Sequence, residues 1–92
     1  MRLHDYPSSG NCYKVRLALA QLDMPYERVN VDIFDGGTLT EDFGALNPAR
    51  TTPVLETDDG VVLVESNAII AYLTEGTNLW PEHPIERAQA LR

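Results

Sequence analysis

Apolar and polar positions follow two different periods along the chain, and these predict both strands and helices. Residues 1–6 are short and partly apolar, and we expect a first strand there. Residues 26–33 alternate at every second position, which is the spacing of another strand. Between them, apolar side chains recur at the spacing of one helix face, at Val15, Ala18, Leu19 and Leu22. A strand–helix–strand crossover of this kind makes the two strands parallel.

The middle of the chain predicts a short helix and a hairpin. Thr40 is placed to cap a helix that ends before Asn47-Pro48. Two apolar runs, residues 54–57 and 61–64, then flank Asp58-Asp59-Gly60. An Asp-Gly step between apolar runs is a strong hairpin signal.

A further helix is expected to begin at a Ser66 cap and to end at Gly76. The predicted order is therefore βαβ, a short helix and ββα. This order is typical of an α/β domain in which helices cover the faces of a four-stranded mixed sheet.

The last residues predict something separate from this domain, which we expect to occupy residues 1–78. Residues 79–92 are interpreted as a linker followed by the first turns of another domain. Pro84 suits a first helical turn, but two turns alone are too short for a stable isolated helix. Trp80, Ile85 and Leu91 need an apolar partner, either this domain or a second, helical one.

Composition narrows the function classes. The chain has 92 residues, of which 43% are hydrophobic, and this fits one small globular domain. Its net charge is −7 and its basic residues are scattered, which argues against nucleic acid as a partner. No apolar run approaches the roughly 20 residues of a membrane helix, so we expect no membrane association and a cytoplasmic location.

The single cysteine limits redox and metal chemistry. Cys12 has no partner for an internal disulfide or a dithiol reaction. His4 and His83 are not spaced as metal ligands relative to Cys12 or to each other, so no metal site is predicted. We expect Cys12 to be a buried, inert side chain.

Three segments carry a resemblance to a known family. They are residues 7–19 (PSSGNCYKVRLAL), residues 47–55 (NPARTTPVL) and residues 65–73 (ESNAIIAYL). In order and spacing they resemble the first strand–helix junction, the loop before the third strand and the start of the third helix of bacterial and zeta-like glutathione transferases. The resemblance covers essentially the whole chain. It implies a thioredoxin-like, glutathione-binding N-terminal domain followed by the stub of an all-helical domain.

The resemblance implies that Ser9 stabilises the thiolate of glutathione. The first helix would begin beside Ser9, where unpaired N–H groups and the positive end of the helix dipole favour a thiolate. Ser8 is the alternative hydroxyl, and Asn11 is a second donor to the sulfur. The alternative interpretation of both Ser9 and Asn11 is that they only cap the helix.

The second segment is expected to hold the backbone of glutathione. The resemblance implies a cis Pro53, so that the N–H and C=O of Thr52 can pair with the cysteinyl part of the ligand like an added strand. An ordinary trans proline at a strand start is the alternative. The family's basic residue lies one position away from Arg50 in this pattern, so Arg50 is expected either to reach the glycyl carboxylate or to lie in solvent.

The third segment is expected to hold the γ-glutamyl end. Ser66 and the N–H groups beside it would bind the α-carboxylate, and Glu65 would pair with the α-ammonium group. An acidic residue beside an ordinary serine cap is the other interpretation.

Together these residues predict a glutathione S-transferase domain that uses glutathione as co-substrate and adds its thiolate to an unidentified electrophile. Two alternatives stay open. One is a non-catalytic binding or interaction module. The other is a thiol–disulfide oxidoreductase, although the missing second cysteine counts against it. Full-length members of the family dimerise, so a homodimer is among the implied partners.

Overall fold

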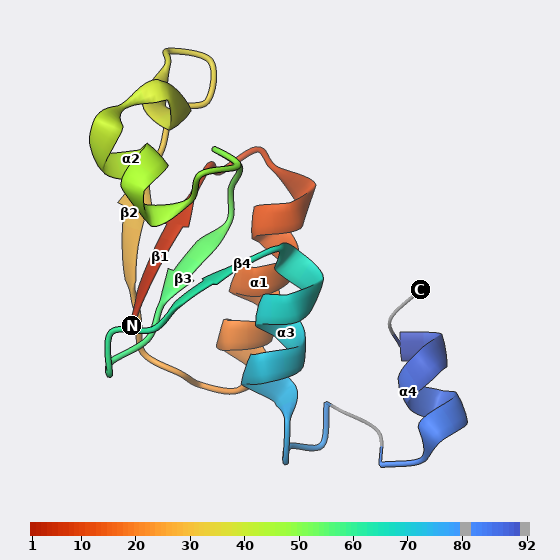
Figure 1. The fold of residues 1–92 in the computed structure, drawn as a ribbon. Helices are drawn as coiled ribbons and strands as arrows, with labels where there is room; N and C mark the ends of the chain where they lie inside the picture. The colour runs from red at the N-terminus through yellow and green to blue at the C-terminus, as the bar shows by residue number, and fades with distance from the viewer. Residues whose placement is uncertain (80–81, 91–92) are drawn as a thin grey trace.

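A four-stranded mixed sheet forms the centre of the molecule in the computed structural model, which describes residues 1–79 and 82–90 (Figure 1). The sheet has the order β2-β1-β3-β4. β1 pairs with β2 in parallel, whereas β3 is antiparallel to both β1 and β4. The strands are β1 (Arg2–Asp5), β2 (Glu27–Asn30), β3 (Val54–Glu56) and β4 (Val62–Val64).

Helices cover both faces of this sheet. Two of them pack side by side on one face, and α2 lies over the other (Figure 1). The helical segments are α1 (Gly10–Gln21), η1 (Gly37–Leu39), α2 (Glu41–Leu46), α3 (Ser66–Thr74) and α4 (Pro84–Ala90). The predicted βαβ-α-ββα order is confirmed, and η1 is an additional turn of helix before α2.

The second strand is shorter than the alternation predicted. It ends at Asn30, although the pattern continues to residue 33. Asp32 turns the chain, because its carboxylate accepts the N–H of Phe34 and its carbonyl accepts the N–H of Gly37 at 2.8 Å. A Cβ at Gly37 would lie 2.8 Å from that carbonyl oxygen, so the tight turn requires a glycine.

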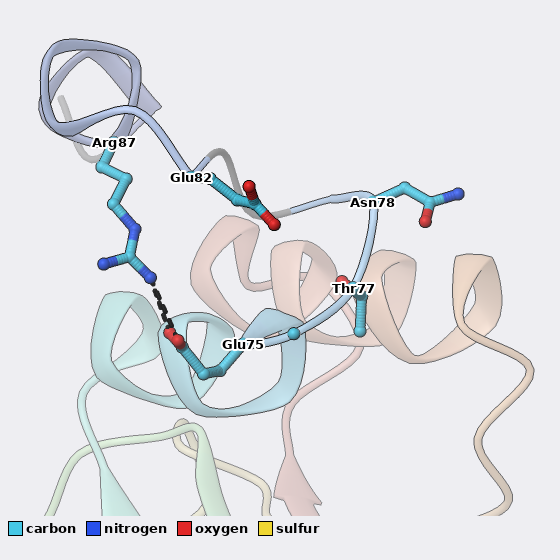
Figure 2. A pocket seen from close by; sticks show the side chains of 6 residues that line it. Glu75, Thr77, Asn78, Glu82 and Arg87 are labelled. Atoms are coloured by element: carbon cyan, nitrogen blue, oxygen red, sulfur yellow. Dashed lines mark hydrogen bonds and ion pairs between the residues drawn. The ribbon is translucent and has the colours of Figure 1, made fainter.

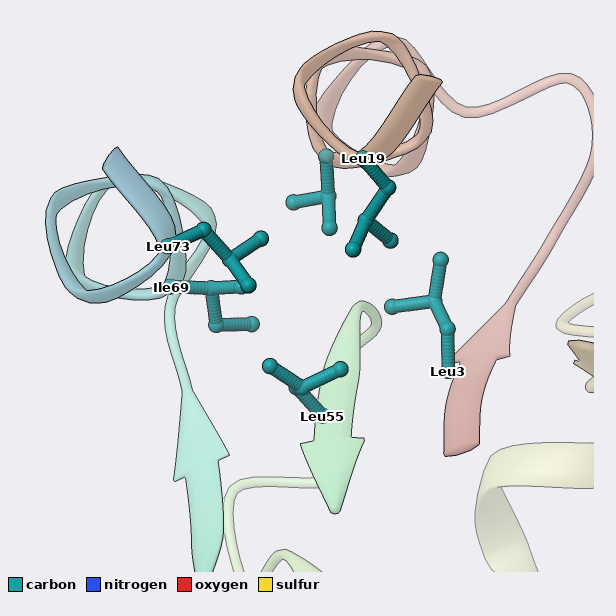
Figure 3. Packing of buried hydrophobic residues seen from close by; sticks show 6 residues of the cluster. Leu3, Leu19, Leu55, Ile69 and Leu73 are labelled. Atoms are coloured by element: carbon teal, nitrogen blue, oxygen red, sulfur yellow. The ribbon is translucent and has the colours of Figure 1, made fainter. Parts of the chain in front are cut away.

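The main core lies between the sheet and the paired helices α1 and α3 (Figure 3). The predicted apolar face of α1 is buried at Val15, Ala18 and Leu19. The buried cluster consists of Leu3, Val15, Leu19, Leu55, Ile69 and Leu73. Since neighbouring residues of a strand point to opposite faces, Leu3 and Leu55 enter this core while His4 and Val54 face α2.

An ion pair links the C-terminal helix to the end of α3. The Nη2 atom of Arg87 in α4 lies 3.0 Å from a carboxylate oxygen of Glu75, at the end of α3. Ile85 remains 63% exposed, so it does not pack onto the domain. Trp80 and Leu91 lie outside the described residues. Among the described helices, none has the length and apolar character needed to cross a membrane.

We predict that Leu55→Ala lowers the free energy of unfolding by about 2–5 kcal/mol, because Leu55 is fully buried among side chains of α1, α3 and the sheet. Leu39→Ala is the matched control. Leu39 is 73% exposed, so its truncation should change stability by less than about 0.5 kcal/mol. Denaturant unfolding of both variants measures the difference, and equal losses would contradict this placement of the core.

Candidate functional site

The pairing of the strands brings the three segments, residues 7–19, 47–55 and 65–73, to one edge of the sheet. At this edge β1 and β4 end and β3 begins. Val54 in β3 lies opposite His4 in β1 and opposite Val64 in β4. The next residues towards this edge are therefore Asp5 at the end of β1, Pro53 just before β3 and Glu65 just after β4. The chain continues from these positions into α1, the loop before β3 and α3, so the loops that carry the predicted site residues meet here.

Ser9 is the N-cap of α1. Its hydroxyl oxygen accepts the N–H of Cys12 at 3.3 Å, and its own N–H donates to the carbonyl of Tyr6 at 3.0 Å. A serine hydroxyl that accepts a hydrogen bond can still donate its hydrogen. Capping the helix and donating to a ligand are therefore compatible. Ser8, the alternative, is exposed and precedes the cap.

A side-chain contact joins the first turns of α1 and α3. The hydroxyl of Ser66 donates to the Oδ1 atom of Asn11 at 3.5 Å, and Ser66 is only 8% exposed. One turn farther on, the ammonium group of Lys14 donates to Oδ1 of Asn67 at 3.2 Å. The residues predicted for the sulfur end and for the γ-glutamyl end are thus neighbours in space, although about 55 positions separate them in sequence.

The prediction that Ser66 caps α3 is wrong. Glu65 occupies the N-cap position, its side chain makes no cap hydrogen bond, and Ser66 is the first helical residue. The chain leaves β4 and enters α3 in a single step at Glu65, which takes a left-handed φ of 70°. This turn directs the Glu65 carboxylate to the surface, where it has no ion-pair partner within residues 1–79 and 82–90. The N–H groups at the start of α3 lack intrahelical acceptors, as in any helix.

The loop before β3 has the peptide geometry that the resemblance implied. The Thr52–Pro53 bond is cis, Pro53 is fully buried and Thr52 is half-buried. Arg50 does not lie free in solvent. Its Nη1 atom donates to the carbonyls of Thr38 and Thr40 at 2.7 and 2.8 Å, so it ties this loop to the segment between η1 and α2.

A buried carboxylate that the sequence analysis did not single out lies beside the Ser9 segment. Asp5 is fully buried at the end of β1 and pairs with two guanidinium groups, those of Arg16 in α1 and Arg28 in β2. No sequence spacing marks this cluster, because its members come from three elements that only the fold brings together.

The free cysteine is buried as predicted. Cys12 has no exposed surface, and the N–H of Tyr6 lies 3.5 Å from its sulfur. Its inaccessibility counts against a thiol–disulfide oxidoreductase. Among the residues described, no three His, Cys, Asp or Glu side chains gather as a metal site would require.

A polar pocket of about 430 Å³ lies between α3 and α4, away from this edge (Figure 2). The Glu75–Arg87 ion pair closes one side of it (Figure 2). Its lining consists of Glu75, Gly76, Thr77, Asn78, Glu82 and Arg87, none of which belongs to the three predicted segments. The pocket therefore marks the junction with α4, at the predicted domain boundary.

Comparison with known proteins agrees with the resemblance. The sequence profile of the glutathione S-transferase N-terminal domain matches residues 3–79. A maleylacetoacetate isomerase of Rhizobium meliloti is 42% identical over 88 residues, which cover 92% of this chain and 41% of that protein.

Two solved structures show the same fold, the thioredoxin-like arrangement that the sequence predicted. A possible glutathione S-transferase from Rhodopseudomonas palustris superposes with a TM-score of 0.91 at 53% identity, over 98% of this chain and 49% of that one. A glutathione transferase homologue from Sulfitobacter with bound glutathione gives a TM-score of 0.88 at 27% identity, over 96% of this chain and 43% of that one. The chain spans less than half the length of each of these relatives.

We predict that Glu65→Gly is more stable than Glu65→Ala by about 1 kcal/mol, because glycine adopts a positive φ without the steric cost that alanine retains. Ala68→Gly, in the regular part of α3, is the control and should instead destabilise by about 0.5–1 kcal/mol. Thermal or denaturant unfolding measures both effects. A glycine at position 65 that is less stable than alanine would show that the left-handed turn is wrong.

Proposed function

This chain belongs to the glutathione S-transferase family, and from that membership we propose that it binds reduced glutathione and stabilises its thiolate for addition to an electrophile. The observation that carries the proposal is the convergence of the three segments on one sheet edge, closed by the contact between Ser66 and Asn11. A relative of the same fold holds glutathione.

The sulfur end would lie at the start of α1. The Ser9 hydroxyl has a hydrogen to donate, and the helix dipole is positive at this end. Both favour a thiolate over a thiol and lower the pKa of the bound glutathione thiol below its ordinary value. Asn11 would be the second donor, through the amide hydrogens that its contact with Ser66 leaves available.

The γ-glutamyl end would lie at the start of α3. Its ammonium group would meet the Glu65 carboxylate, which is exposed and has no ion-pair partner in the described part of the chain. Its carboxylate would accept hydrogen bonds from the N–H groups of the first turn of α3 and, when the Ser66 hydroxyl turns from Asn11 to the ligand, from that hydroxyl. The peptide between the two ends would pair with the backbone of Thr52, beside Pro53.

The reaction beyond thiolate formation is assigned by analogy with the relatives. Conjugation of glutathione to an electrophile is the first candidate. A glutathione-dependent isomerisation is the second, favoured by the 42% identity with a maleylacetoacetate isomerase. A non-catalytic glutathione-binding module of the same fold is the alternative to both.

The setting of this activity is also a proposal. Residues 79–92 would be the linker and first turns of the helical domain that supplies the electrophile site, and α4 with its exposed Ile85 would belong to it. We propose a cytoplasmic homodimer, since the cytosol maintains reduced thiols and full-length members of the family dimerise.

We predict that reduced glutathione binds this chain with release of protons at neutral pH, and that Ser9→Ala diminishes this release. The thiol must lose its proton to become a thiolate, and the variant removes the hydroxyl that stabilises the anion. Calorimetric titration in buffers of different ionisation enthalpy measures the protons released. Ser8→Ala is the matched control and should behave like the parent.

A folded parent that binds no glutathione would contradict the proposed function. Equal proton release by the parent and by Ser9→Ala would support glutathione binding but contradict the proposed role of Ser9. Loss of the release in Ser8→Ala alone would transfer that role to the neighbouring serine.

Glu65→Gln tests the γ-glutamyl end. It removes the negative charge that would meet the ammonium group while it keeps the size of the side chain. Because Glu65 is exposed, we expect the affinity for glutathione to fall by roughly two- to fivefold. Glu41→Gln makes the same charge change at the exposed start of α2 and should leave the affinity unchanged in the same titration. An equal loss in both variants would indicate a general charge effect and contradict the assignment.

A further inference from the structure

The turn that leads into the Ser9 cap accepts a hydrogen bond from the side chain of Arg16 in α1. The N–H of Ser9 donates to the carbonyl of Tyr6 at 3.0 Å, which closes a four-residue turn with Pro7 at its second position. Arg16, almost two turns along α1, reaches back over this turn. Its Nη2 atom donates to the carbonyl of Pro7 at 3.0 Å.

The same guanidinium group is anchored at its other nitrogen. The Nη1 atom of Arg16 donates to Oδ2 of Asp5, which is fully buried at the end of β1. The planar fork of arginine can make two such bonds at once in a fixed relative geometry, which a lysine cannot reproduce. Arg16 therefore connects the turn at Pro7 to Asp5 at the end of β1.

The bond to Pro7 acts on the part of the turn that is otherwise free to rotate. The proline ring fixes φ of Pro7, so the orientation of the Pro7–Ser8 peptide depends on ψ of Pro7 and φ of Ser8. Rotation of this central peptide distinguishes type I from type II turns. Holding the Pro7 carbonyl selects one orientation of this peptide and so restrains the backbone immediately before Ser9.

We infer that Arg16, anchored on Asp5, is a positioning residue that fixes the Ser9 hydroxyl in the place where it stabilises the glutathione thiolate. This inference rests on the proposed function. Arg16 acts through the turn, because within the described residues its guanidinium group donates to Asp5 and to Pro7 and not to Ser9.

Arg28 provides a matched comparison within the same cluster. Its Nη2 atom donates to the other oxygen of Asp5 at 3.1 Å, but Arg28 comes from β2 and, within the described residues, makes no hydrogen bond or ion pair with the turn. Removing either arginine leaves Asp5 with one cation. A role limited to balancing the charge of Asp5 therefore predicts the same thiolate fraction for Arg16→Met and Arg28→Met.

The experiment measures, for the parent and each variant, the affinity for reduced glutathione and the pH dependence of thiolate absorbance of the bound ligand. Arg16→Met should lower the thiolate fraction at neutral pH by roughly three- to tenfold, whereas Arg28→Met should match the parent. Unfolding curves of both variants establish that each is folded. Equal thiolate fractions in the two variants would overturn the inference.

Arg16→Lys distinguishes the effect of the positive charge from the effect of the bond to Pro7. It also replaces Arg16→Met in the test if that variant does not fold. It keeps a cation beside Asp5 without the second bond to Pro7. We expect a thiolate fraction between those of the parent and of Arg16→Met, and a value equal to the parent would overturn the inference. Failure of the parent itself to ionise glutathione would instead refute the proposed function, so the two failures are distinguishable.

Discussion

The pairing of β3 with both β1 and β4 is the constraint on which the arrangement of the candidate site depends. Val54 lies opposite His4 on one side and Val64 on the other, and this single register decides which residues reach the edge of the sheet. A shift by one residue would turn Leu55 out of the core and exchange it with Val54. The hydrophobic pattern that stabilises the domain therefore also aligns Asp5, Pro53 and Glu65.

The elements at this edge show unfavourable local features that the rest of the fold must support. Glu65 has a left-handed φ that an L-residue rarely adopts, and Asp5 is a carboxylate without exposed surface. Such features persist only where the surroundings determine them, and they concentrate at functional sites. Here the support is the pairing of β4 before Glu65 and the two guanidinium groups around Asp5.

Sequence reasoning was strongest where one element determines its own pattern. The apolar face of α1, the Thr40 cap and the Asp-Gly hairpin turn depend on neighbours within a few residues, and the structure contains all three.

Sequence reasoning failed where contacts between distant elements determine the local structure. A serine before an apolar run predicts a cap, yet the sharp entry from β4 moves the cap to Glu65. The alternation of β2 runs past Asn30 because Val31 is buried against α2, not because the strand continues. The partners of Arg50 are carbonyl groups, which carry no sequence signal.

The distribution of charge indicates how an anionic ligand would be held at this edge. Within the described part of the chain every lysine and arginine already has a partner, these residues being Arg2, Lys14, Arg16, Arg28, Arg50 and Arg87. With a net charge of −7, the domain offers little long-range attraction to an anion. The carboxylates of glutathione would then depend on hydroxyl and backbone N–H donors at the helix starts. Such donors act only at short range, so their placement by the sheet register and by the turn before Ser9 matters more than the total charge of the domain.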